Sequence, residues 1–575
     1  MNIVDRAAKL FDAWYDRLSP RRFYPLLLGM LVLIGLLPLL MPGMPGGHDM
    51  YYHFSRLHTM CVNFRLGEIP SMINHEALGN HGYATGLFYP DLFLYPAALL
   101  MLCGLGIVAA YKLLIVVWVL ATAYSAYFCA GKLSRSHFGA FAAALLYTWS
   151  SYLATDIFTR AALGEFLVFA FMPWIILGLY EIIFGRPERF FYFSLGFLGV
   201  IYSHNLSLLM LAAICAVVIA FNALRFLREP RRLLYLAISP LPAVLAGCAS
   251  LVPMFEQFAH IDFIIKAEKN EQILEQCIPF LKLFLEFPAS KREIWIPPGI
   301  GVIFFIVAVQ RFRLSSKRTA GEIFRDILLI SGAACLLMAT DMPPWKGVFK
   351  PLAVIQFPWR FFAPATAFLA VGGGMTLADL TGGDRSRERF WLRVVLLGSA
   401  FAWFVNVGYL YAARIHERSI IKGFRPGRPQ EASGVHYLPL GSLPDTELRK
   451  RGDVVVTRHP LECRVVRPRK DILELSFSGN SRDNAVELPL VPYYGYAATL
   501  HPAGASGAGQ RLKVGVGPNK LLSVRLPGKC QAGVVRVRYR ATSAQRVSQC
   551  LSLVSLLGIA VVLVPKLRRR NKVSA

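Results

Sequence analysis

Apolar runs of nearly membrane-spanning length recur along this chain, and they limit the folds that it can adopt. About 20 consecutive apolar residues are needed to cross the hydrocarbon core of a bilayer. Hydrophobic residues make up 55% of the 575, more than a soluble domain usually contains. We therefore predict a mainly α-helical, multi-pass membrane protein. The expected spans are approximately 23–41, 107–130, 138–154, 164–184, 190–203, 206–226, 233–254, 295–312, 325–340, 361–380, 391–411 and 550–566.

The net charge of +27 follows the positive-inside pattern, because most basic residues lie in short clusters between the spans. No polyanionic partner is needed to explain this charge, and we expect no nucleic-acid binding. The segment 91–130 is long enough for two spans, but one span preceded by an interfacial helix at 91–103 places every basic cluster inside. This version gives twelve spans with both termini cytoplasmic.

The chain divides into four expected regions. Residues 1–22 form a cytoplasmic interfacial helix, and the first apolar run after them is a span, not a cleavable signal. Residues 23–411 form the transmembrane domain, with a large first outer loop at 42–106. Residues 412–548 form an extracytoplasmic β-rich domain, and residues 549–575 provide the final helix and a basic tail.

The β-rich prediction rests on short runs that alternate with a period of two and are bounded by turn residues. These runs are 453–456, 472–477, 512–516, 521–526 and 534–539. They predict an all-β, sandwich-like domain of about a hundred residues. Its excess of basic residues favours anionic lipid headgroups or an anionic glycan, although a packing cap over the membrane core explains it equally well. Cys463 and Cys530 could pair in an exported domain, and the sequence leaves this open.

The first outer loop opens with an unusually polar segment at 47–56. Asp49, His53 and Arg56 are spaced i, i+4, i+7, so in a helix they share one face. A carboxylate can accept the proton of an attacking hydroxyl or bind a divalent cation such as Mg or Mn. An adjacent His or Arg can hold a phosphate. The alternatives are a solvated loop carboxylate and histidines that act as interfacial anchors.

A second polar cluster, Asp156, Arg160 and Glu165, lies between the third and fourth expected spans. Glu165 begins an apolar helix, where an acid is favoured by the helix dipole. The helix dipole does not explain the presence of Asp156 and Arg160, which are four residues apart. Ionisable residues at this depth are candidates for function, and Arg160 is the expected partner of one acid.

Two further outer segments carry candidate residues. His204 and Asn205 lie at a tight turn between spans, which Asn suits for structural reasons alone. Trp359 and Arg360 begin a span, where both are ordinary interface anchors, but Arg also binds lipid phosphate well. Gln356 and the two residues after it indicate a specific backbone turn. The run 372–374 of three glycines lies within a span and indicates close helix packing.

Several of these segments together resemble a known family. They occur in the order 47–56, 88–92, 159–166, 203–205, 355–361 and 437–439. The family is the bacterial membrane family labelled 6-pyruvoyl-tetrahydropterin synthase-related, which is near the YfhO-like proteins. The label is a poor guide to chemistry, because the sequence provides neither a soluble pterin-enzyme core nor its zinc-binding histidine set.

The architecture is also similar to that of the GT-C glycosyltransferases, which use polyprenyl-phosphate sugars as donors and carry an acid in the first outer loop. On this resemblance Asp49 matches the first-loop acid, and Asp156 and Glu165 are candidates for the second acid. The candidates for binding donor phosphate or substrate are His53, Arg56, Arg160, His204, Asn205, Gln356, Trp359 and Arg360. The sequence departs from the family pattern at Pro90-Asp91, where Pro-Pro is common. Asp91 either adds a carboxylate to the site or caps the interfacial helix.

The resemblance implies a glycosyltransferase of the bacterial cytoplasmic (inner) membrane with an extracytoplasmic active face. It would transfer a sugar from a polyprenyl-phosphate-linked donor to an extracytoplasmic glycan or lipid acceptor. The alternative is a non-catalytic membrane protein or a transporter that handles lipid-linked glycans. Transporters place polar residues along the midplane, whereas here the polar residues gather at the outer rim.

Overall fold

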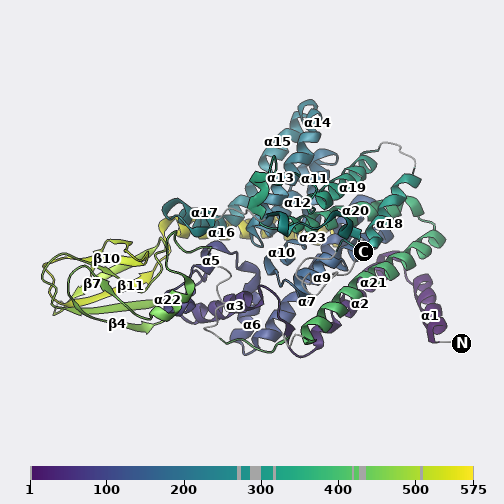
Figure 1. Cartoon of the computed structure of the whole chain (residues 1–575). Helices are drawn as coiled ribbons and strands as arrows, with labels where there is room; N and C mark the ends of the chain where they lie inside the picture. The colour runs from purple at the N-terminus through teal and green to yellow at the C-terminus, as the bar shows by residue number, and fades with distance from the viewer. Residues whose placement is uncertain are drawn as a thin grey trace. The chain divides into compact units, whose positions relative to one another are not determined.

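The structure is a computed structural model that describes residues 3–267, 273–284, 299–314, 319–416, 420–425, 436–504 and 509–573 (Figure 1). It contains two compact units, each assembled from segments that are distant in sequence. Unit 1 comprises Met1–Met50, Val108–Val244 and Asn270–Gly423. Unit 2 comprises Tyr51–Ile107, Leu245–Lys269 and Phe424–Ala575.

The protein is mainly helical, as expected. In the described part of the chain, five helical segments are long and apolar enough to cross a membrane. They are Ile107–Ser134, Pro230–His260, Pro358–Thr381, Arg385–Gly408 and Ser543–Val561. The other spans of the twelve-span topology remain a prediction, and the start of the one expected at 295–312 lies outside the described residues.

Helix α20 (Phe362–Thr381) is the buried centre of unit 1. It packs against α8 (His137–Thr148), α18 (Val302–Val309) and α19 (Ala320–Met338). A Cβ atom built on Gly374 would lie 2.5 Å from the carbonyl oxygen of Gly139 in α8. Small residues therefore let the two backbones approach closely, which confirms the packing interpretation of residues 372–374.

The N-terminal helix α1 (Ile3–Arg17) packs against α2 (Pro20–Gly35), where the Trp14 ring contacts that of Phe23 at 4.8 Å. Its acidic face meets the basic start of α21 (Arg385–His416). Arg389 donates to Asp16 at 3.0 Å. These contacts attach α1 to the bundle through both its apolar and its charged residues.

The remaining helices of unit 1 with eight or more residues complete the bundle in Figure 1. They are α7 (Ile107–Ser134), α9 (Ser151–Phe158), α11 (Met172–Ile183), α12 (Phe191–Ile201), α13 (Asn205–Phe221) and α15 (Pro230–Ile238). Helix α16 (Leu241–His260) runs from unit 1 into unit 2.

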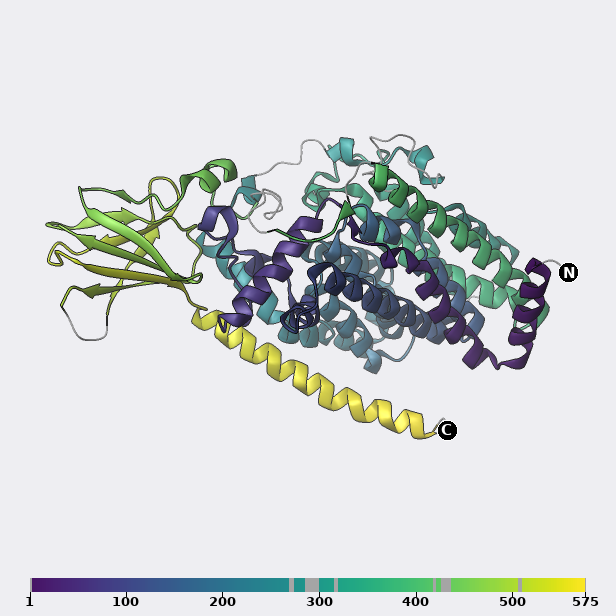
Figure 2. The ribbon, with the colours of Figure 1, turned by 90° about the horizontal axis from the view of Figure 1, so that it is seen from below.

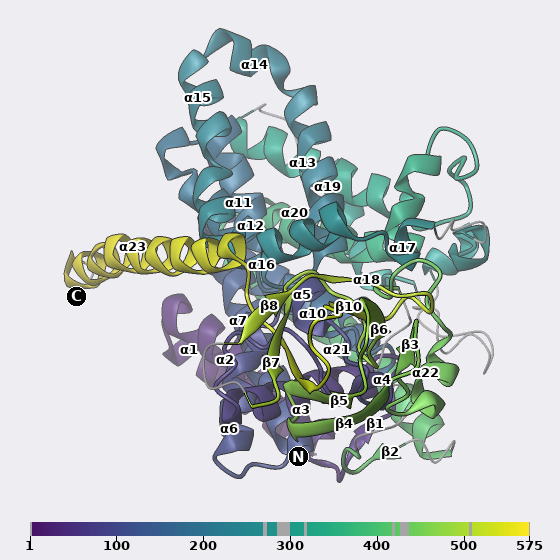
Figure 3. The same ribbon diagram turned by 90° about the vertical axis from the view of Figure 1, so that its left-hand side faces the viewer.

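Unit 2 contains α3 (Met50–Arg65), α6 (Tyr95–Leu102) and two antiparallel sheets (Figure 3). The first sheet has the order β3-β6-β10-β9 and the second β4-β5-β11-β7-β8. Apolar residues of both sheets belong to one buried cluster, which includes Leu475 of β5 and Val524 of β10. The strands are β3 (Val456–Thr457), β4 (Glu462–Arg469), β5 (Ile472–Ser478), β6 (Asn484–Glu487), β7 (Tyr496–Pro502), β8 (Gln510–Leu512), β9 (Val514–Val516), β10 (Leu522–Leu526) and β11 (Gly533–Tyr539).

The period-two pattern located β5, β10 and β11 to within a residue or two, because their inward side chains alternate with exposed ones. The expected strand at 512–516 is instead two short strands, β8 and β9, separated at Lys513. Strand β4 was missed because it is a largely exposed edge strand that contains Pro468, and an edge position needs no apolar alternation. Cys463 and Cys530 are both free thiols.

The chain leaves the sheets through α23 (Ser543–Val573), a single continuous helix (Figure 2). Within unit 2 this helix contacts α16, where Ser552 accepts a hydrogen bond from the backbone N–H of Ala249 at 2.8 Å. The side chain of Gln257 in α16 bonds both backbone groups of Tyr494, at 2.7 and 3.0 Å. The β-rich region is thus tied to the end of a long apolar helix.

Candidate functional site

The turn after α9 brings the first outer loop against the second polar cluster. The backbone N–H of His48 donates to Thr159, and that of Asp49 donates to Arg160 at 3.0 Å. A Cβ on Gly47 would lie 2.7 Å from that of Ala161, so only glycine permits this approach. Ala161 itself has φ +51°. A non-glycine residue in this conformation is strained, and such strain is frequent at functional sites.

Glu165 is the centre of a buried ion cluster. It lies in the first turn of α10 (Leu163–Val168), as the sequence indicated. Arg160 donates to both of its carboxylate oxygens, at 2.7 and 2.8 Å. The Nε of Arg360 donates to Oε1 at 2.7 Å, and the Tyr152 hydroxyl donates to Oε2 at 2.8 Å. Two guanidinium groups hold Glu165 in its ionised form.

Asp156 shares Arg160 with Glu165. Its Oδ1 accepts from Nη1 of Arg160 at 2.8 Å, so Arg160 is the partner of both acids, where one was expected. Its Oδ2 is buried and has no hydrogen-bond partner among the described residues. Burial raises the pKa of Asp156.

Asp49 differs from these two acids because its side chain is partly exposed. Desolvation by the surrounding protein raises the pKa of Asp49 to about 6, and the charge of Glu165 adds to this effect. The guanidinium groups of Arg160 and Arg360 oppose it. Asp49 is therefore an accessible carboxylate that still ionises near neutral pH, a combination suited to a general base.

Arg360 is fixed by the turn that precedes it. Its Nη1 donates to the carbonyl of Ile355 at 2.5 Å and to the side chain of Gln356 at 3.2 Å. Gln356 has φ +68°, so the specific turn expected here is a left-handed one. Nε of Arg360 is occupied by Glu165, whereas Nη2 has no protein partner in the described part of the chain.

Trp359 forms an aromatic wall beside the arginines. Its ring stacks on Phe357 at 4.8 Å with an interplanar angle of 4°. The guanidinium of Arg160 lies 6.0 Å from the Trp359 ring, and that of Arg360 lies 4.9 Å from the ring of Phe357. The Trp359 side chain is buried and packs against these cationic groups.

His204 is the N-cap of α13, and Asn205 is the first residue of that helix. The ring Nδ1 of His204 accepts from the backbone N–H of Ser207 at 3.3 Å, so this turn has the structural role that the sequence allowed. A Cβ on Gly164 would lie 3.0 Å from the His204 ring. His204 thus packs directly against the turn that carries Glu165.

His53 and Arg56 lie within α3, in unit 2, whereas Asp49 precedes this helix. The prediction that all three extend from one helix face is therefore wrong for Asp49. Arg56 is buried and binds Asp91, with Nη2 2.6 Å from Oδ1, and it also donates to the carbonyl of Pro90 at 2.7 Å. Asp91 is thus the partner of a buried arginine. That role was not among the alternatives drawn from the sequence.

Sequence reasoning missed Tyr152, which donates to Glu165 and accepts from Arg160 at 3.1 Å. Tyr152, Asp156 and Arg160 follow one another at intervals of four residues. This spacing places them along one face of α9 and its end, and it could have identified the tyrosine. In the described part of the chain, no group of three or more His, Cys, Asp or Glu residues is placed to hold a metal ion.

Comparison with solved structures gave remote similarities, of which two are described. Arabinofuranosyltransferase AftD from Mycobacteria matches with a TM-score of 0.44 and 14% identity, over 69% of this chain and 27% of that protein. An oligosaccharyltransferase from Archaeoglobus fulgidus matches with a TM-score of 0.41 and 14% identity, over 71% of this chain and 56% of that one. These scores are too low to assign a shared fold. A comparison with curated proteins found no match.

The family assignment comes from the sequence model of a domain described as "6-pyruvoyl-tetrahydropterin synthase related domain; membrane protein". It matches residues 87–408, more than half of the chain. The matched range contains the whole Asp156–Glu165 cluster and Arg360. The chain belongs to the 6-pyruvoyl-tetrahydropterin synthase-related family of membrane proteins.

Proposed function

We propose that this protein is an integral membrane glycosyltransferase that uses a polyprenyl-phosphate-linked sugar donor and an extracytoplasmic glycan or lipid acceptor. Three facts support the proposal: membership of a membrane protein family, the sequence resemblance to GT-C enzymes, and the cluster around Asp49. The cluster carries most weight, because it joins an accessible carboxylate to two guanidinium groups. A general base for the acceptor hydroxyl and cationic groups for the leaving phosphate both suit glycosyl transfer from a phosphate-linked donor.

The proposed reaction assigns the proton and the leaving group to different residues. The acceptor hydroxyl attacks the anomeric carbon of the donor sugar, and its proton moves to Asp49. A new glycosidic C–O bond forms while the bond between the sugar and the phosphate oxygen breaks. The polyprenyl phosphate leaves with the electron pair, and cationic side chains stabilise the negative charge that it gains.

Arg360 is the residue best placed to bind the leaving phosphate, since its Nη2 has no described protein partner. Glu165 is a positioning residue in this proposal. It binds Arg360 through Nε and Arg160 through both terminal nitrogens. Buried ion pairs of this kind fix the direction in which the remaining donors point.

A divalent cation such as Mg or Mn would be compatible with Asp49. Mg²⁺ is commonly held by one or two carboxylates together with substrate phosphate oxygens and water. Asp49 is the accessible carboxylate of the cluster. Such a cation, when bound, would add positive charge next to the donor phosphate.

The proposal places the cluster on the extracytoplasmic side of the bacterial cytoplasmic membrane. Support comes from the positive-inside pattern, in which twelve spans leave 42–106, 155–165 and 412–548 outside. The two sheets of residues 456–539 then form an exported, sandwich-like domain. A reporter fused at Ser134 is expected to be cytoplasmic, and an external signal there contradicts the topology.

The function is tested with purified full-length protein and a panel of polyprenyl-phosphate sugars. We expect wild-type protein to release polyprenyl phosphate, and Asp49→Asn to reduce the rate by at least 100-fold, the scale expected for loss of a general base. Asp341→Asn, which changes an exposed carboxylate outside the cluster, is the control and should match the wild type. Equal turnover by wild type and Asp49→Asn contradicts the role of Asp49. Donor binding without turnover by the wild type favours the non-catalytic alternative.

A further inference from the structure

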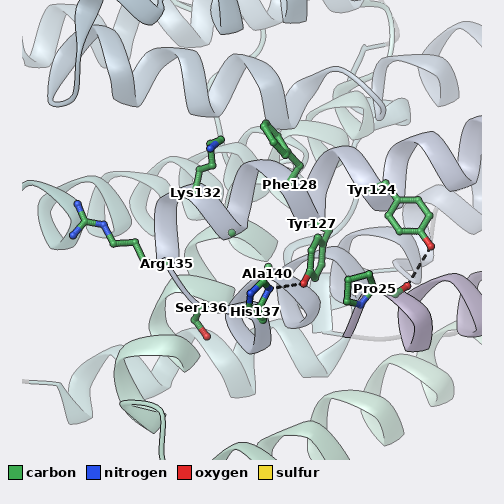
Figure 4. A pocket seen from close by; sticks show the side chains of 10 residues that line it. Pro25, Tyr124, Tyr127, Phe128, Lys132, Arg135, Ser136, His137 and Ala140 are labelled. Atoms are coloured by element: carbon green, nitrogen blue, oxygen red, sulfur yellow. Dashed lines mark hydrogen bonds between the residues drawn. The ribbon is translucent and has the colours of Figure 1, made fainter. Parts of the chain in front are cut away.

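A hollow of about 560 Å³ lies in unit 1 beside α7 and α8 (Figure 4). Its main wall is one face of α7, on which Tyr124, Phe128, Lys132 and Arg135 recur at intervals of three or four residues. Gly131 lies between them on the same wall and leaves room, because it has no side chain. None of these residues belongs to the Asp49 cluster, so the hollow is a separate feature.

The two ends of this hollow differ in chemistry, as Figure 4 shows. Lys132 and Arg135 lie at one end, and Tyr124 and Pro25 lie at the other. Eleven residues of helix separate Tyr124 from Arg135, which corresponds to about 16 Å at a rise of 1.5 Å per residue. A ligand that fills the hollow therefore meets cationic groups at one end and aromatic or apolar surface at the other.

Arg135 is the more informative of the two basic residues. It has φ +54° at the end of α7, a conformation that glycine adopts without strain and that other residues rarely adopt. Its side chain is exposed and forms no ion pair within the described residues. A long cationic side chain at a position that favours glycine points to a role for the side chain itself.

Aromatic groups line the middle of the hollow. The ammonium of Lys132 lies 5.0 Å from the ring of Phe128. The Tyr127 hydroxyl bonds Nδ1 of His137 at 2.8 Å and holds this ring in the lining of the hollow. Phe128 is exposed on the same helix as Leu113 and Val117. Exposed apolar side chains along a membrane-spanning helix face lipid, so the hollow opens on the lipid side of α7.

We propose that this hollow binds an anionic glycerophospholipid. The lipid phosphate would contact Lys132 and Arg135, and one acyl chain would lie against Phe128, Tyr124 and Pro25. Charge complementarity favours an anionic headgroup, since no described acid neutralises Arg135. The apolar length of the hollow favours a whole lipid over free phosphate. The proposal does not depend on the glycosyltransferase activity.

The test measures lipid binding to the full chain by native mass spectrometry. Protein in detergent is mixed with phosphatidylglycerol or with zwitterionic phosphatidylcholine, and the adducts are compared. Arg135→Gly removes the cation but suits the positive φ, so this variant is expected to unfold at a temperature no lower than the wild type. Arg228→Gln, in an exposed basic cluster elsewhere in unit 1, is the matched control.

The wild type should bind phosphatidylglycerol in preference to phosphatidylcholine. One lost Lys or Arg contact near a membrane surface corresponds to about a fivefold loss of affinity. Arg135→Gly should therefore weaken binding about fivefold, Lys132→Gln with Arg135→Gly should weaken it more than tenfold, and Arg228→Gln should leave it unchanged.

Several outcomes overturn the proposal. Equal binding of the two lipids removes the charge argument, and unchanged binding by a folded Arg135→Gly places the lipid elsewhere. Displacement of the lipid by millimolar inorganic phosphate shows a simple anion site. Selective retention of a polyprenyl phosphate over phosphatidylglycerol assigns the hollow to a different lipid class.

Discussion

Arg160 and Glu165 form a two-point ion pair, with Nη1 2.7 Å from Oε2 and Nη2 2.8 Å from Oε1. Both side chains are buried. The pair is extended by Arg360, which reaches the same carboxylate from a segment 195 residues away. The two arginines of the site therefore take their orientation from one acid.

Glu165→Gln is expected to destabilise the protein strongly. It removes the charge that compensates two buried guanidinium groups, and breaking a buried pair in this way costs about 3–5 kcal/mol. Tyr152→Phe is the matched comparison, because it deletes only the hydrogen bonds of one neutral hydroxyl, to Glu165 and from Arg160, and leaves both arginines paired with Glu165. Its cost should be about 1–3 kcal/mol. Thermal unfolding in a single detergent measures both, and equal effects would contradict the central role of the charge.

The contacts within this cluster differ in how far the sequence could predict them. The sequence predicts that Arg160 pairs with one acid, and Asp156 lies one helical turn from it. The contact between Arg360 and Glu165 depends on the packing of α20 against α8 and α9. A single sequence contains no local pattern for such a contact. A turn at Gln356 was expected, but its left-handed conformation and the one at Ala161 were not, because neither residue is one that normally marks a left-handed position.

Asp49→Asn should stabilise the folded protein above about pH 6. In the folded state the pKa of Asp49 is raised from 3.8 to about 6, so the folded state binds the proton more tightly than the unfolded state. Stability is therefore lost as pH rises between these two values, and the loss is constant at higher pH. Because the carboxylate is partly exposed, we expect a gain of only about 1–2 kcal/mol for the variant.

The measurement compares the unfolding temperatures of wild type and Asp49→Asn at pH 4, 6 and 8. The difference should be near zero at pH 4 and should reach its full size by pH 8. A variant that is less stable than the wild type at pH 8 contradicts the desolvation of Asp49. Asp341→Asn, which changes an exposed carboxylate outside the cluster, is measured in parallel as the control.

The fold was predictable where one side chain pattern dominates. Long apolar helices can be recognised in the sequence because their whole surface is apolar. Alternating strands such as β5 and β11 can be recognised because one of their faces is apolar. The expected span 138–154 covers α8 and the first half of α9, which are two helices with Ser150 as the cap between them. The local hydrogen bond of a serine cap interrupts a helix without changing its average hydropathy.

Gly374→Ala is expected to destabilise unit 1 by about 1–3 kcal/mol, the usual cost of overpacking. The added methyl would lie 2.5 Å from the Gly139 carbonyl and 2.7 Å from Cβ of Ala143, and a backbone atom cannot move aside. Gly408→Ala is the matched control in α21, where a Cβ meets nothing within 4 Å. Helix propensity predicts a gain of up to about 1 kcal/mol there. Changes of opposite sign in the unfolding temperatures of the two variants support the close packing of α8 and α20, and equal changes contradict it.

Glu76→Gln tests the charge contacts within unit 2. Glu76 accepts hydrogen bonds from His58 at 3.1 Å and from Lys470 at 2.7 Å. These bonds lower its pKa from 4.5 to about 2, with His58 the largest cause. A lowered pKa in the folded state contributes stability above pH 4.5, and this contribution is lost as pH falls toward 2.

With a quarter of the carboxylate side chain exposed, we expect the variant to lose about 1–2 kcal/mol at pH 7. The unfolding temperatures of wild type and Glu76→Gln should converge as pH falls below 4. A constant difference down to pH 3 would show that the loss at pH 7 has a cause other than ionisation of Glu76.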